Sequence, residues 1–185
     1  MARSLILAAG AIAALTGGSA AAQSATDTKS FTVTGNVPAL CSGGTIAGAG
    51  STFDLGVLVD TSTGVLRTDL AAPPKTLTGA FCSAQSTITV AATPLAAQNF
   101  TATPPAGFSR SVNYTATASG WTTTPASFAT GAATNAAATQ TRATAFSGDI
   151  TVGIGTFGTS GGNALRLVAD TSYVGVVTVT LAVAN

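Results

Sequence analysis

The side chains that could perform acid–base chemistry are few in this sequence, and they form no known catalytic motif. The chain of 185 residues has no histidine and no glutamate, and its six aspartates are scattered between Asp27 and Asp170. A Ser-His-Asp triad needs an imidazole, and a glycosidase needs two carboxylates flanking one bond. Asp54, Asp60 and Asp69 are neighbours in sequence but lack the spacing of a calcium-binding loop. The sequence therefore predicts that the protein is not an enzyme and uses no cofactor or metal.

One glycine motif has the spacing of a dinucleotide-binding fingerprint. Gly153-Ile-Gly155-Thr-Phe-Gly158 matches G-x-G-x-x-G. That fingerprint needs a helix directly after it, because the pyrophosphate rests on the helix N-terminus. The residues that follow, Thr159-Ser-Gly-Gly-Asn163, are typical of a loop. The motif is therefore expected to be a glycine-rich turn.

The two cysteines, Cys41 and Cys82, are predicted to form a disulfide bond. They are the only cysteines in the chain. A structural zinc site needs about four ligands, and there is no histidine to join the two thiolates. A bridge between them closes a loop of about 40 residues, which stabilises the fold by roughly 3–4 kcal/mol in the chain-entropy model.

The first 22 residues have the three parts of a secretory signal peptide. Arg3 gives a positive start, residues 5–15 form an apolar run, and small residues at 20–22 provide an exit before Gln23. A membrane-spanning helix needs about 20 apolar residues, and this run is shorter. We therefore expect residues 1–22 to be removed during export, and the mature chain not to span a membrane.

The mature chain is expected to carry very little charge. Removing Arg3 leaves six basic and six acidic residues, so that the net charge is near zero. A chain without a basic patch is not expected to bind nucleic acid. Charged residues make up 7% of the sequence, against about 25% in ordinary soluble domains. This composition is typical of secreted β proteins, and it also fits a surface that is covered by copies of the same chain.

Short segments with period-two alternation predict an all-β fold. They are rich in β-branched and aromatic residues and are bounded by turn residues, which is the strand signature. The segments are 31–37, 53–59, 77–82, 87–90, 111–117, 149–154 and 173–183. Helix-forming patterns are poor, and residues 129–143 are expected to form a long excursion or an edge. The pattern predicts a β-sandwich or barrel in one domain over residues 23–185.

Trp121 is the only tryptophan, and it admits two interpretations. An exposed tryptophan can stack on a sugar or form the centre of an interface. A buried one fills the core of a sandwich, and this is the preferred interpretation.

The two ends of the mature chain carry a family resemblance. Phe31-Thr-Val-Thr-Gly-Asn-Val-Pro-Ala-Leu-Cys41 is an alternating segment that leads to the first cysteine, and Tyr173 precedes an alternating V-T-V-T-L run that ends at Leu181. With the cysteine spacing, these segments resemble the spore coat protein U family, which belongs with archaic chaperone–usher pilin subunits. The resemblance implies an immunoglobulin-like β-sandwich that lacks one strand, and hence a hydrophobic groove.

The resemblance also implies how such a groove is filled. A periplasmic chaperone occupies it first, and the N-terminal segment of another subunit replaces the chaperone by β-strand addition at an outer-membrane usher. In this chain the donor segment would be residues 23–37, with Phe31, Val33 and Val37 as its apolar face. Alternatively, this segment is the first strand of a self-sufficient sandwich.

Two functions remain open from the sequence. The first is a structural subunit of a surface pilus or fibre (fimbrium), exported through the periplasm and bound to copies of itself or to related subunits. The second is a self-contained secreted adhesin or carbohydrate-binding module, which would depend on exposed aromatic residues such as Trp121 or Tyr114.

Overall fold

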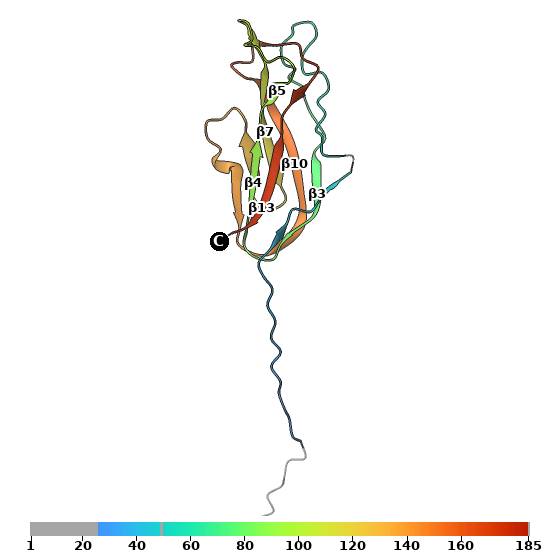
Figure 1. The fold of residues 1–185 in the computed structure, drawn as a ribbon, viewed down its shortest axis with the longest axis vertical. Helices are drawn as coiled ribbons and strands as arrows, with labels where there is room; N and C mark the ends of the chain where they lie inside the picture. The colour runs from blue at the N-terminus through green and yellow to red at the C-terminus, as the bar shows by residue number, and fades with distance from the viewer. Residues whose placement is uncertain (1–25, 49, 185) are drawn as a thin grey trace, which may run out of the picture. The chain divides into compact units, whose positions relative to one another are not determined.

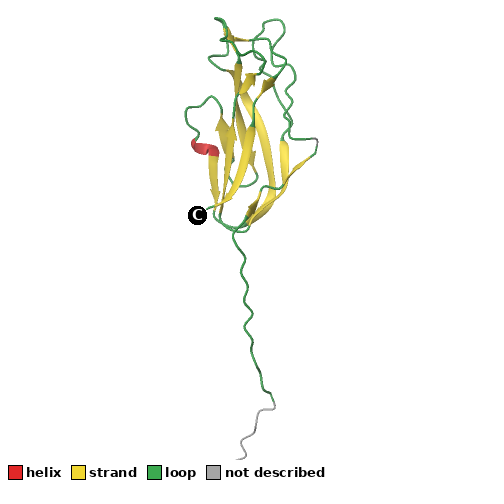
Figure 2. Ribbon diagram, viewed as in Figure 1, coloured by secondary structure: helices red, strands yellow, loops and turns green. Residues whose placement is uncertain are grey.

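The computed structural model describes residues 26–48 and 50–184 (Figure 1). These residues form β-strands and loops, with a single short 3-10 helix, η1 (Ala136–Ala138) (Figure 2). The prediction of an all-β chain is therefore confirmed. The chain divides into two units, Met1–Asn36 and Val37–Asn185. The predicted signal peptide, residues 1–22, lies outside the described residues.

The larger sheet has eight antiparallel strands. They are β1 (Cys41–Ser42), β2 (Thr45–Ala47), β3 (Lys75–Cys82), β5 (Leu95–Ala97), β7 (Ser111–Ser119), β8 (Ala126–Ala129), β10 (Phe146–Thr159) and β12 (Tyr173–Val174). The main order is β1-β3-β10-β7-β5-β12, while β2 pairs with β3 and β8 pairs with β7. The long strands β3, β10 and β7 are neighbours at the centre of this sheet, and their buried side chains contribute to the hydrophobic core.

The smaller sheet has three antiparallel strands in the order β13-β4-β9. They are β4 (Ser86–Ala92), β9 (Thr139–Arg142) and β13 (Val177–Val183). A separate parallel pair joins β6 (Phe108–Ser109) to β11 (Arg166–Leu167). Strands that are far apart in the sequence thus lie side by side, as β4 and β13 do in Figure 1.

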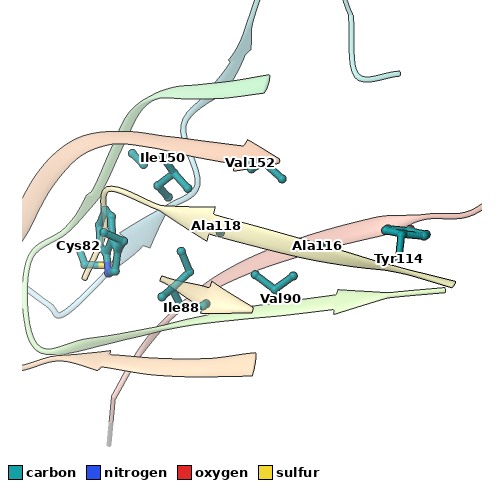
Figure 3. Close-up of a cluster of buried hydrophobic side chains, with 11 residues drawn as sticks. Cys82, Ile88, Val90, Tyr114, Ala116, Ala118, Ile150 and Val152 are labelled. Carbon is teal, nitrogen blue, oxygen red and sulfur yellow. The ribbon is translucent and has the colours of Figure 1, made fainter. Parts of the chain in front are cut away.

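The hydrophobic core lies between the two sheets (Figure 3). Ile88 and Val90 on β4 belong to the same buried cluster as Ala116 on β7 and Ile150 on β10. Burial alternates along β4 and β7, because successive side chains of a strand point to opposite faces. The period-two pattern in these segments therefore marks the side chains that form the core.

The two sheets approach each other differently on their two sides. On one side β8 pairs with β7 and also contacts β4 and β9, which closes the gap between the sheets. On the other side β1 and β3 contact β13, but neither pairs with it. The result is a half-barrel whose open side runs along β13.

Four of the predicted strands are confirmed within longer strands of the structure. They are segments 77–82, 87–90, 111–117 and 149–154, which lie in β3, β4, β7 and β10. The predicted strand 173–183 is divided at Gly175 into β12 and β13. Residues 129–143 hold η1 and the edge strand β9, as the edge alternative anticipated.

The predicted strand 53–59 is wrong, and the predicted strand 31–37 is not formed within the single described chain. Segment 53–59 takes part only in an isolated bridge between Val59 and Leu66. The carboxylate of Asp54 accepts a hydrogen bond from the Gly56 N–H at 2.9 Å, and Gly56 has a φ of +62°, so that the chain turns locally. Segment 31–37 forms no strand. Alternation favours a strand, but a strand also needs a hydrogen-bonding neighbour.

The disulfide bond between Cys41 and Cys82 is present, as predicted. It joins paired residues of β1 and β3. Among the helices of the described residues, none has both the length and the apolar character needed to cross a membrane.

Candidate subunit-assembly site

The outer edge of β13 is the main candidate site of the described residues. Hydrogen bonding to β4 runs along the whole inner edge, from Val177 opposite Ala92 to Val183 opposite Ser86. No strand pairs with the outer edge in the part of the chain that the structure describes. Such an edge presents a row of backbone N–H and C=O groups that can pair with another strand.

The side chains of β13 that point toward the core are less buried than their partners on β4. Ile88 and Val90 are 0% and 1% exposed. Their direct partners, Leu181 and Val179, pack against the same core but remain partly exposed. Since paired residues share one face of the sheet, the difference arises from the missing neighbour beside β13. Apolar side chains along this edge are therefore only partly covered.

A cavity of about 420 Å³ lies at the Val177 end of β13. Its lining includes Phe53, Leu55, Leu95, Tyr114, Ile154 and Val177. Segment 53–59, which was predicted to be a strand, thus supplies part of the wall instead. Most of these side chains are apolar, so the cavity suits hydrophobic side chains of an added strand.

The start of β13 is held in a fixed position by hydrogen bonds. The Tyr114 hydroxyl donates to the Val176 carbonyl at 3.3 Å, and the Val176 N–H donates to the Thr93 hydroxyl at 2.9 Å. Burial raises the pKa of Tyr114, so its hydroxyl stays protonated and able to donate. Gly175 is required here, because a Cβ at this position would lie 2.7 Å from the Thr93 carbonyl oxygen.

The N-terminal unit carries the predicted donor residues, and they are exposed. Residues 26–36 form no strand, and Phe31 and Val33 are 87% and 95% exposed. Val37, the first residue of the other unit, is 81% exposed. Asp27 and Lys29 form an exposed ion pair at 2.8 Å. The structure assigns these residues no strand partner, so their role as a donor stays a prediction.

Ser83 holds the residues that precede β1, and the sequence analysis missed it. Its N–H donates to the Leu40 carbonyl at 2.9 Å, and its hydroxyl accepts from the Leu40 N–H at 3.0 Å. The same hydroxyl lies 3.3 Å from the Pro38 carbonyl oxygen, to which it can donate. A serine in the turn after the second cysteine has no sequence signature that would have revealed this contact.

Asp60 and Asp69 bind hydrogen-bond donors of their own loops, at Ser62, Thr63 and Arg67. The pKa of Asp60 is lowered by hydrogen bonds from Ser62 and from the Thr63 N–H, and the pKa of Asp69 is lowered by its hydrogen bonds from Arg67. Within residues 26–48 and 50–184, no group of three histidine, cysteine or acidic residues is placed to hold a metal ion.

Asp170 is the most strongly bound carboxylate. It accepts hydrogen bonds from the N–H groups of Asn99, Phe100 and Ser172 and from the Asn99 amide. Desolvation raises its pKa, but these hydrogen bonds outweigh it and lower the pKa to about 2. The carboxylate thus fastens the loop after β5 to the turn before β12.

The aromatic residues considered for sugar binding are buried. Trp121 is fully buried and Tyr114 nearly so, which confirms the core interpretation of Trp121. The Phe146 ring stands at 89° to the Trp121 ring with 5.1 Å between centroids, and the Arg142 guanidinium lies 3.6 Å from the Phe146 centroid. A carbohydrate site built on Trp121 or Tyr114 would require the core to open.

The glycine motif lies inside a strand, so the prediction of a turn is wrong. Gly153, Gly155 and Gly158 belong to β10. The pairing of β10 with β7 shifts register between Gly155 and Gly158, where Thr156 has a φ of +51°. This is a β-bulge, and its left-handed residue is Thr156 and not one of the three glycines. A strand continues through the motif, and the helix that a dinucleotide would require is missing from it.

Comparison with protein-family models, with curated proteins and with solved structures finds no match to this chain. The family resemblance of its two ends therefore remains a hypothesis. The features of the chain that bear on its function are the β13 edge and the apolar residues at 31, 33 and 37.

Proposed function

We propose that this protein is a structural subunit of a surface fibre that assembles by donor-strand exchange. In this proposal Val37–Asn185 is an immunoglobulin-like β-sandwich that lacks one strand, and residues 23–37 complete the sandwich of another subunit. The observation that carries the proposal is the partial exposure of Val179 and Leu181 beside the fully buried Val90 and Ile88.

The character of the β13 edge supports assembly rather than protection. β13 spans seven residues and contains no charged side chain. The opposite edge of the same sheet, β9, spans four residues and includes Gln140 and Arg142. Short edges and edges with charged side chains are among the usual protections against edge-to-edge pairing. The long neutral edge of β13 has none of these devices, which suits a strand that receives a partner.

The spacing of the alternating positions in segment 31–37 matches the spacing of the core-facing residues of β13. Positions 31, 33, 35 and 37 fall on one face of an extended chain, as do Val177, Val179, Leu181 and Val183 on β13. Both sets span six residue steps, or about 20 Å at 3.3 Å per residue. Gly35 adds no side chain to this face, so three apolar side chains, Phe31, Val33 and Val37, would fill the groove.

The proposal includes partners and a location. An unfilled groove would aggregate, so the subunit would need a periplasmic chaperone before assembly and an outer-membrane usher during it. The fibre would lie at the cell surface after export of the chain through the periplasm. The disulfide Cys41–Cys82 is compatible with such an oxidising environment.

The test compares the mature chain with a variant that lacks residues 23–37. The full chain should form regular oligomers in size-exclusion chromatography with light scattering, and the deletion variant should lose these oligomers and be less stable. A peptide of residues 26–37 should raise the melting temperature of the deletion variant, whereas the same peptide with Val33→Asp should not. If both proteins are equally stable monomers and the peptide does not change their melting temperatures, the proposal is wrong.

A further inference from the structure

The residues just before β1 run in a direction that the structure defines. β1 pairs antiparallel to β3, with Cys41 opposite Cys82. The bond from the Ser83 N–H to the Leu40 carbonyl continues this ladder by one residue beyond the strand. Leu40 therefore continues the line of β1 past the end of β3, toward the turn that joins β3 to β4.

The same turn marks the end of β13. Val183 lies opposite Ser86, the first residue of β4, and the Ala184 N–H donates to the Gln85 carbonyl at 2.9 Å. The Tyr114 hydroxyl bonds to Val176 at the start of β13, and the Trp121 indole, just after β7, bonds to Ser86 beside its end, so β13 runs the same way as β7. Since β7 and β3 are both antiparallel to β10, β13 also runs the same way as β3 and opposite to β1. To lie along its own β13, the segment before Val37 would have to reverse direction between Val37 and Cys41.

Ser83 opposes such a reversal. It makes two hydrogen bonds with the backbone of Leu40, and its hydroxyl can also donate to the Pro38 carbonyl, 3.3 Å away. Pro38 adds a second restraint, because its ring restricts its own φ and favours an extended conformation at Val37. A tight reversal at residues 38–40 would have to break the Ser83 hydrogen bonds.

We propose that Ser83 is a positioning residue that prevents the N-terminal segment from filling the groove of its own chain. The occupant of the groove is then the segment 26–37 of a second copy. Each copy would insert its own segment 26–37 into the groove of one neighbour, and its own groove would bind the segment of another neighbour. Such a head-to-tail interface generates an open filament when its rotation does not close into a ring. This inference rests on the proposed donor role of residues 23–37, and it adds the reason that pairing occurs between chains.

Thiol cross-linking separates pairing within a chain from pairing between chains. Thr34 and Thr180 alternate with the groove-facing positions, so cysteines there would leave the groove unchanged. The native cysteines are both in the disulfide, so the introduced thiols would be the only free ones. We expect a mixture of Thr34→Cys and Thr180→Cys chains, refolded together, to give cross-linked pairs. A chain with both changes should give a ladder of oligomers.

Ser83→Ala in the double-cysteine chain should raise the fraction of intramolecularly cross-linked monomer about tenfold at equal protein concentration, because the hydrogen bonds of the Ser83 hydroxyl with the Leu40 N–H and the Pro38 carbonyl are lost, while the backbone bond from the Ser83 N–H remains. Ser83→Thr keeps a hydroxyl and should restore the ladder, and Ser147→Ala, an exposed serine of β10, should leave it unchanged. Insertion of Gly-Ser-Gly-Ser after Val37 should raise the intramolecular fraction even with Ser83 intact, since it gives the chain room to reverse.

Two results would overturn the inference, and they differ in what else they exclude. Intramolecular cross-linking of the double-cysteine chain with Ser83 intact, to the same extent as with Ser83→Ala, removes the role of Ser83 but keeps the segment in the groove. No cross-link in any arrangement means that the segment does not reach the groove, which overturns the proposed function as well.

Discussion

The indole N–H of Trp121 donates a hydrogen bond to the hydroxyl of Ser86 at 3.2 Å, and both residues are completely buried. The bond links the loop after β7 to the first residue of β4. Trp121 is the largest fully buried side chain, and this bond gives its indole nitrogen a hydrogen-bond acceptor inside the core. The smaller sheet is thereby attached to the core at the end where β13 finishes.

Ser86→Ala is expected to lower the free energy of unfolding by about 1–3 kcal/mol, because the Trp121 N–H would remain buried without an acceptor. Urea denaturation followed by tryptophan fluorescence measures the change. The matched control is Ser147→Ala on exposed β10 surface, which should change stability by less than about 0.5 kcal/mol. Equal effects of the two changes would contradict a structural role for the Ser86 hydrogen bond.

The Asp170 carboxylate is expected to make stability depend on pH in the acid range. Its folded pKa of about 2 is below the ordinary value of 3.8. A depressed folded pKa adds stability above the unfolded pKa, and that contribution is lost as pH falls from about 4 to about 2. The stability of the Asp170→Asn variant should therefore differ from that of the parent above pH 5, and the two stabilities should converge near pH 2. Melting curves at several pH values would show this, and a constant difference would refute it.

Gly175→Ala is expected to destabilise the start of β13. The added Cβ would lie 2.7 Å from the Thr93 carbonyl oxygen and 3.1 Å from that of Pro94, so the backbone must shift. A loss of about 1–3 kcal/mol is typical of overpacking. Gly155→Ala is the matched control, because a Cβ there meets nothing within 4 Å. Thermal unfolding compares the two, and a similar small loss for both would show that β13 tolerates the change.

Loss of the disulfide is expected to lower stability without changing the core. Replacing Cys41 and Cys82 together by serine removes a link across 41 residues of sequence, worth roughly 3–4 kcal/mol in the chain-entropy model. Denaturant unfolding of the parent with and without a thiol reductant should give about the same difference. If the reductant lowers the stability of the double variant as much as that of the parent, the loss of stability in the parent is not due to reduction of this disulfide bond.

Much of the fold can be predicted from local patterns. Residues 86–92 and 111–119 alternate between buried and partly exposed positions over most of their length, and alternation in sequence is sufficient to identify such strands. Segment 53–59 shows the limit of this reasoning. Its apolar residues alternate too, but the Asp54–Gly56 turn and the lack of a continuous neighbouring strand give it a different role.

The candidate site could be predicted only in part. The alternating apolar residues at Phe31, Val33 and Val37 are visible in the sequence. The Ser83 contacts are not, because they join a turn to residues more than 40 positions earlier, at Leu40 and Pro38. Contacts of this kind depend on the register of β1 against β3, which no local pattern specifies.

The sequence by itself determined the chemistry that this protein lacks and the faces of its strands. It has no histidine, two cysteines that can only pair with each other, and the V-T-V-T-L run with valine and leucine on one face. The tertiary structure alone decided that β13 is an edge. Side-chain alternation specifies which face of a strand is buried, but backbone hydrogen bonds decide which neighbours it has, and those neighbours come from distant parts of the chain. Leu181 is therefore a core residue by its pattern and a partly exposed residue by its position.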